Sequence, residues 1–135
     1  MLKARPIYAT ARAIAMMVLL ALAACSPSGP TTPPAGSPER EAILAAISKG
    51  RPIADQVFDV RDLKVQGDWA WVTADPQSKD GSQHYETESW LLQKTGGAWN
   101  VVAQPCAEEG CVLKDEIAKI RARFPQAPEA IFPKA

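Results

Sequence analysis

An apolar run followed by a proline-rich stretch limits how much of this 135-residue chain can fold around a core. Residues 1–24 carry Lys3, Arg5 and Arg12 and no acidic residue, and residues 13–24 read AIAMMVLLALAA. This run is shorter than the roughly 20 apolar residues of a transmembrane helix and is typical of a secretory signal. We therefore expect residues 1–24 to be a signal peptide. The alternative is an N-terminal anchor that is never cleaved.

The residues at the end of the apolar run predict a covalent modification as well. Leu22-Ala23-Ala24-Cys25 resembles the lipobox of bacterial lipoproteins. The resemblance implies that the Cys25 thiol receives a diacylglycerol, that cleavage occurs just before Cys25, and that the new amino group is acylated, with palmitate as a typical chain. It also implies a membrane-anchored protein of the cell envelope. In enterobacterial lipoproteins an aspartate after the cysteine favours retention in the inner membrane. Residue 26 is a serine, so the resemblance favours the periplasmic side of the outer membrane. The alternative is a plain signal peptide with an incidental cysteine.

The stretch after Cys25 is unsuited to a folded core. Residues 26–38 hold five prolines and otherwise only Ser, Thr, Gly and Ala. Such a segment stays extended at about 3 Å per residue, so it reaches roughly 40 Å at most. We expect residues 25–38 to be an acylated tether and residues 39–135 to be one folded domain. After residue 24 the chain has 12 basic and 15 acidic residues, a balance that excludes an electrostatic surface for nucleic acid.

The hydrophobic pattern of the folded part predicts a helix and then a meander of strands. Ser37 is placed to cap a helix that begins at Pro38, and Gly50 is suited to end it. Residues 57–74 read VFDVRDLKVQGDWAWVTA, which predicts two strands joined at Gly67-Asp68. The strands are expected to pair as Val65 with Ala70 and Leu63 with Val72 on the face toward the helix, and as Lys64 with Trp71 and Gln66 with Trp69 on the other face. Phe58 and Val60 have the opposite parity to Leu63 and Val65, so we expect a bulge or bend near Arg61-Asp62.

The second half of the domain repeats the hairpin and adds a helix. Residues 74–85 read as a polar loop, with turn residues at Asp75-Pro76. Residues 85–94 and 99–104 predict a second hairpin. A final helix is expected from about Val112, with an apolar stripe of Leu113, Ile117, Ile120 and Phe124. We expect the tail after it to be extended, with Ile131 and Phe132 docked on an apolar surface.

These elements predict an α+β domain of two layers, in which an N-terminal helix packs on an antiparallel sheet of about four strands and a C-terminal helix follows. Residues 39–104, with a Gly-Asp-Trp-Ala hairpin and a later Leu-Leu … Gly-Gly-x-Trp hairpin, resemble cystatin-like and nuclear-transport-factor-2-like bacterial domains. The resemblance implies a curved sheet that wraps the helix. Such domains include enzymes, ligand binders and interaction domains, so the fold alone assigns no function.

Two cysteines and one histidine are the candidates for chemistry. Cys106 and Cys111 have four residues between them, and an envelope location favours a structural disulfide worth about 2 kcal/mol. A redox-active pair is the alternative, and zinc is disfavoured because ligands are lacking. His84, with Glu86 and Glu88 nearby, would make half of an acid–base site, but the same residues read as a surface loop and a solvated strand start. We therefore expect no catalytic residue, no metal site, and no cofactor beyond the lipid on Cys25.

Trp69 and Trp71 are the candidates for binding, since the pairing places both on the face away from the helix. An exposed tryptophan pair suits a protein partner or a sugar. Alternatively the C-terminal helix or tail covers them. The resulting expectation is a non-catalytic binding module, whose partner is an envelope protein or cell-wall glycan. The alternative function is a ketosteroid-isomerase-like enzyme, or a small-ligand-binding domain, with a pocket between helix and sheet.

Overall fold

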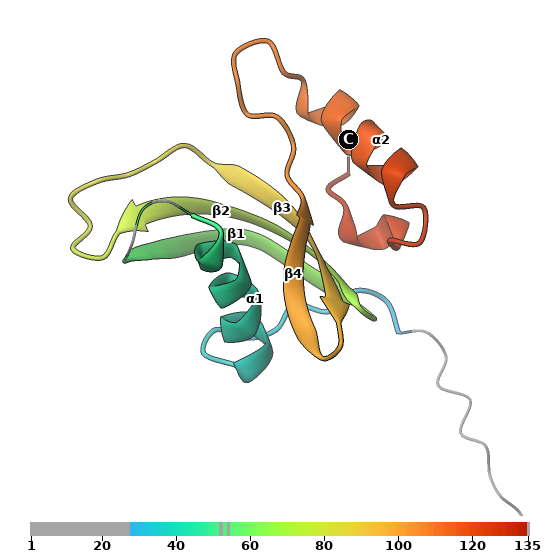
Figure 1. The fold of residues 1–135 in the computed structure, drawn as a ribbon, viewed down its shortest axis with the longest axis horizontal. Helices are drawn as coiled ribbons and strands as arrows, with labels where there is room; N and C mark the ends of the chain where they lie inside the picture. Colours follow the sequence, from blue (N-terminus) through green and yellow to red (C-terminus); the bar gives the residue numbers. More distant parts are fainter. Residues whose placement is uncertain (1–27, 52, 54, 135) are drawn as a thin grey trace, which may run out of the picture.

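A computed structural model describes residues 28–51, 53 and 55–134. The predicted signal peptide, Cys25 and Ser26 lie outside the described residues. The elements in chain order are α1 (Pro38–Lys49), β1 (Gln56–Gln66), β2 (Trp69–Ser78), β3 (Glu88–Thr95), β4 (Ala98–Ala103), α2 (Leu113–Arg123) and a short 3₁₀ helix, η1 (Glu129–Ile131). The strands form one antiparallel sheet in the order β1-β2-β3-β4 (Figure 1). The predicted α+β class, with two helices and a four-stranded antiparallel sheet, is confirmed.

The first hairpin has the register that the sequence predicts. Val65 pairs with Ala70, and Lys64 pairs with Trp71. Gly67 has φ 59°, a left-handed conformation that glycine adopts without strain and that suits a two-residue turn between twisted strands. The turn residues and the alternation of side chains agree on one register, because a slip of one residue would move every apolar side chain to the wrong face.

The predicted bulge lies in β1 at Arg61. Val60 pairs with Ala74 and Asp62 pairs with Thr73, so Arg61 has no partner of its own in β2. The extra residue restores the parity of the strand: Phe58, like Val60, packs against the same apolar cluster as the residues after the bulge.

Strand β2 runs further than the sequence predicts. Asp75 and Pro76, expected in a polar turn, lie inside β2, and Pro76 is fully buried opposite Phe58. The carbonyl of Pro76 accepts a hydrogen bond from the Tyr85 backbone N–H at 2.9 Å, on the side away from β1. The backbone nitrogen of Pro76, which carries no hydrogen, is on that same side. The pairing between β1 and β2 therefore loses no hydrogen bond, and the strand continues.

Helices cover both faces of the sheet, which makes three layers where two were expected. On one face α1 packs Ile43 and Ile47 into a cluster with Val72 and Trp90. On the other face α2 and the C-terminal tail form a second cluster around Trp71 (Figure 1). The two clusters take alternate residues of the same strands, as the period of two in a strand requires.

The proline-rich segment joins the domain before α1 begins. The Thr31 backbone N–H and carbonyl each bond to the Val65 backbone at 2.8 Å, and the Thr32 hydroxyl donates to the Leu63 carbonyl at 2.9 Å. Pro33, the next residue, is buried. β1 is an edge strand with unpaired backbone groups, and Thr31 caps part of that edge. Residues 31–33 of the predicted tether are therefore held against the sheet.

Candidate functional site

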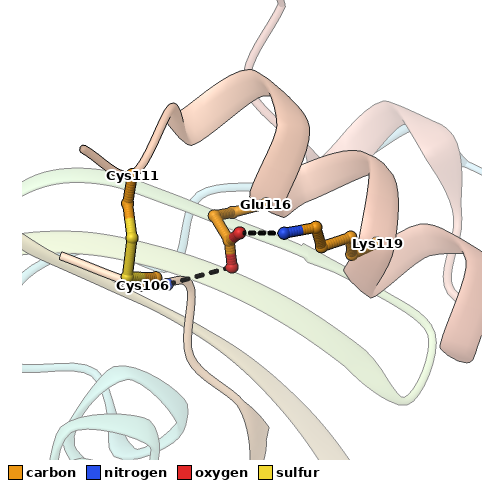
Figure 2. Close-up of a disulfide and its surroundings, with 4 residues drawn as sticks. All are labelled: Cys106, Cys111, Glu116 and Lys119. Carbon is orange, nitrogen blue, oxygen red and sulfur yellow. Dashed lines mark hydrogen bonds and ion pairs between the residues drawn. A yellow bond between two sulfur atoms is a disulfide. The ribbon is translucent and has the colours of Figure 1, made fainter. Parts of the chain in front are cut away.

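The connection between β4 and α2 is closed by a disulfide. Cys106 and Cys111 are bonded, with their Cα atoms 5.8 Å apart. The Glu116 carboxylate accepts a hydrogen bond from the Cys106 backbone N–H at 3.3 Å and pairs with Lys119 Nζ at 2.7 Å (Figure 2). The hydrogen bond from Lys119 and that from Cys106 lower the pKa of Glu116, and Glu116 raises the pKa of Lys119. These contacts hold the first turns of α2 beside the disulfide.

The structure does not bring together the three residues that were considered for an acid–base site. His84 and Glu86 are exposed, and Glu88 is paired elsewhere. Arg51 binds Glu88 with two hydrogen bonds, at 2.8 and 2.7 Å, and Gln104 donates a third to it at 2.7 Å. The hydrogen bonds from Arg51 are the main reason that the pKa of Glu88 lies below its ordinary value. A carboxylate held ionised in this way is a poor general acid or base near neutral pH.

Arg51 is a residue that the sequence reasoning missed. It follows the C-cap Gly50 of α1, and its guanidinium lies 5.8 Å from the ring centroids of both Phe58 and Trp90. Sequence periodicity carries no signal for this residue, because its partner is 37 residues away and the contact depends on how α1 ends beside the sheet. The bidentate pairing and the aromatic neighbours suit arginine in particular.

Trp69 and Trp71 are buried, at 7% and 0% exposure. Their rings lie against Phe124 (centroids 5.9 Å apart) and Phe132 (5.3 Å), respectively. The two tryptophans therefore do not form the exposed binding surface that was expected; α2 and the tail cover them, as the alternative prediction had it. The apolar stripe of α2 requires a counterpart, and the two indoles provide it.

An open groove of about 900 Å³ lies between α2 and the C-terminal tail, beside the N-terminal segment. Its apolar wall includes Leu113, Ile117 and Phe132, and Pro30 contributes from the N-terminal side. Leu113 was expected in the buried stripe of α2, but its exposed fraction is 48% because it lies in the first turn, at the mouth of this groove. We call this site the α2 groove.

The charged residues of the α2 groove are mostly cationic. Four basic side chains and one carboxylate line it, namely those of Lys64, Lys114, Arg121, Lys134 and Glu129. Arg121 pairs with Glu129 at 2.9 Å and lies 5.9 Å from the Phe132 ring centroid. Apolar surface with a cationic rim suits an anionic amphiphile or an anionic surface. The sequence gives a weak indication of this cationic rim, since Lys114 and Arg121 flank the apolar stripe of α2.

The described residues hold no group of three or more His, Cys, Asp or Glu side chains placed to bind a metal ion. In the part of the chain that the structure describes, no helix has both the length and the apolar character needed to cross a membrane. Comparison of the chain with protein-family models, with curated proteins and with solved structures finds no match.

Proposed function

We propose that this chain is a bacterial lipoprotein of the cell envelope whose domain binds a partner and catalyses no reaction. The lipid anchor is supported by the charged start, the apolar run and the lipobox-like Leu22-Ala23-Ala24-Cys25. More than one acyl chain on Cys25 makes a durable anchor, whereas a single chain binds a membrane only marginally. Ser26, in place of an aspartate, supports a location on the periplasmic side of the outer membrane.

One observation carries the non-catalytic part of the proposal. The space between α1 and the sheet, where a ketosteroid-isomerase-like enzyme would place its polar pocket, is filled by apolar side chains. Ile43, Ile47 and Trp90 there are no more than 2% exposed. A pocket lined by buried ionisable residues would have favoured the enzyme, because acid–base catalysis needs groups whose pKa is tuned by burial or close partners.

The finer fold assignment belongs to this proposal. We propose that α1 and the sheet are a variant of the cystatin-like and nuclear-transport-factor-2-like arrangement, with a curved sheet around the helix. The order of α1 followed by the strand meander supports this variant. α2 and the tail are additions that close the second face of the sheet. In such a variant the binding partner meets the outer surface of the domain, because both faces of the sheet are occupied.

Two measurements test the proposal. Mass spectrometry of the membrane fraction should find a mature chain that begins at acylated Cys25, and Cys25→Ser should give an unprocessed or soluble product. Affinity purification from detergent-solubilised envelope should recover an envelope protein or a cell-wall glycan fragment with the acylated chain. A mature chain of unmodified mass that begins at another residue would refute the anchor. A stable His84→Ala variant that has lost its cellular phenotype would support the enzyme instead.

A further inference from the structure

We propose that the α2 groove lies on the surface of the membrane that holds Cys25, and that its cationic rim binds anionic phospholipid headgroups. The inference rests on the proposed lipid anchor and adds an orientation to it. The face formed by α2 and the tail would point toward the bilayer, and α1, on the opposite face of the sheet, would point toward the periplasm (Figure 1).

Chain length constrains where the groove can be. Pro30 lines the groove, and Thr31 is fixed to Val65 by two backbone hydrogen bonds, so this end of the N-terminal segment cannot leave the domain without breaking them. Cys25 precedes Pro30 by five residues. An extended chain spans at most about 3.6 Å per residue, so Cys25 lies within about 18 Å of Pro30. A cysteine anchored at the bilayer surface therefore holds the groove close to the headgroups.

The charge of the groove complements such a surface. Lys64, Lys114 and Lys134 line it together with the Arg121–Glu129 pair, although acidic residues outnumber basic ones after residue 24, 15 to 12. Among the described residues Lys114 and Lys134 form no ion pair, and Lys64 lies 3.2 Å from Asp62. Basic residues near a membrane surface are attracted to anionic lipid, and the attraction falls off within a Debye length.

The apolar residues at the mouth of the groove fit the same occupant. Leu113, which lines the groove, is 48% exposed, and Val112, the residue before it at the start of α2, is 56% exposed. An apolar patch with lysines around it is the composition of a segment that lies in the interfacial region of a bilayer. A glycan would leave these side chains without an apolar counterpart. A protein partner would satisfy them but would compete with the nearby bilayer for the same face.

Lysine footprinting of the acylated wild-type protein tests the orientation. The protein is reconstituted into vesicles of phosphatidylcholine alone, or of phosphatidylcholine and phosphatidylglycerol in equal amounts, and is acetylated briefly before mass spectrometry. We expect Lys64, Lys114 and Lys134 to react about fivefold more slowly on the anionic vesicles, the factor that one lysine–headgroup contact provides. The exposed Lys49 and Lys79 are internal controls and should react equally on both. At about 1 M salt the protection should disappear, because the Debye length is then about 3 Å.

A pair of variants separates headgroup binding from a general effect of the vesicles. In Lys114→Gln/Lys134→Gln we expect the protection of Lys64 to be lost, whereas the matched Lys49→Gln/Lys79→Gln variant should keep it. Equal labelling of Lys64, Lys114 and Lys134 on the two kinds of vesicle would overturn the inference and leave the lipid anchor standing. Protection that requires an added envelope extract would also overturn it, in favour of a protein partner. A chain without acyl groups on Cys25 would overturn both the anchor and the orientation.

Discussion

At the scale of single residues, Trp71 shows how a side chain on the sheet face away from the first helix becomes buried in the domain. Its ring packs on Phe132, and its indole N–H donates to the Thr73 hydroxyl at 3.2 Å. The Thr73 hydroxyl in turn lies 2.9 Å from the Ser89 hydroxyl. A buried tryptophan needs both an apolar environment and a partner for its N–H, and this site offers both.

The first prediction concerns this packing. Trp71→Ala should lower the free energy of unfolding by about 3–5 kcal/mol, because it removes a large buried ring from the second core. His84→Ala, in an exposed loop, should change that free energy by less than about 0.5 kcal/mol. Urea denaturation followed by circular dichroism measures both. A loss below about 1 kcal/mol for Trp71→Ala would mean that α2 and the tail do not cover this face in solution.

The second prediction concerns the cysteines. A thiol assay on the denatured, unreduced envelope protein should find neither Cys106 nor Cys111 reactive. Replacing both with serine should lower the free energy of unfolding by about 2 kcal/mol, the chain-entropy contribution of a short loop, and should leave the fold intact. Two titratable thiols in material taken from the envelope would show that the bond is not present there.

At the scale of elements, ion pairs help to hold the connections between helices and strands. Arg51 lies between α1 and β1, and through Glu88 it joins that connection to the start of β3. The two side chains are only 15% and 18% exposed, so each would be costly to leave without the other. The Glu116–Lys119 pair in α2 lies nearer the surface and is worth less.

The third prediction is the pH dependence of the Arg51–Glu88 pair. The pKa of Glu88 is lower in the folded protein than in the unfolded chain, so the unfolded chain takes up the proton first as the pH falls. The stabilisation is therefore complete above the unfolded pKa of about 4.3 and is lost as the pH falls through the folded pKa.

Glu88→Gln should consequently lower the free energy of unfolding by about 1–3 kcal/mol at neutral pH, and the difference from wild type should shrink toward pH 3. Denaturation of both proteins across this range measures it. Glu86→Gln, two residues away and exposed, is the matched control and should follow the wild type. A Glu88→Gln deficit that stays constant with pH would point to lost packing and not to the charge.

At the scale of the whole molecule, one sheet supports two cores. Ala70 and Val72 face the cluster under α1, and Trp69 and Trp71, on alternate positions of the same strand, face the cluster under α2. The residues of α1 belong to the first cluster and those of α2 to the second, and both clusters depend on β2 and β3 keeping their register. The two cores should therefore unfold together.

The fourth prediction follows from this coupling. Ile43→Ala in the first core and Ile131→Ala in the second should each shift a single unfolding transition to lower denaturant, by about 2–5 kcal/mol in the free energy of unfolding. Tryptophan fluorescence and far-ultraviolet circular dichroism should give the same midpoint in each variant. If fluorescence changes first in Ile131→Ala, the tail and α2 form a separate, weaker unit.

The sequence by itself determined the local structure of this protein. The turn at Gly67-Asp68 and the alternation beside it set the register of the first hairpin, because a slip by one residue would reverse every side chain. The change in parity before Leu63 predicted a bulge near Arg61-Asp62, and the structure has it at Arg61. The expected envelope location favoured a bond between Cys106 and Cys111, which lie close together in the chain. Each of these features depends on residues close together in the chain.

Only the tertiary structure decided which surfaces are covered. The pattern placed Trp69 and Trp71 on the second face of the sheet but could not decide between a binding partner and the C-terminal helix or tail as their cover, because that depends on where the chain folds back after β4. The Arg51–Glu88 pair and the α2 groove arise in the same way, from residues far apart in the chain. Local rules choose helices, turns and register, whereas burial depends on long-range packing.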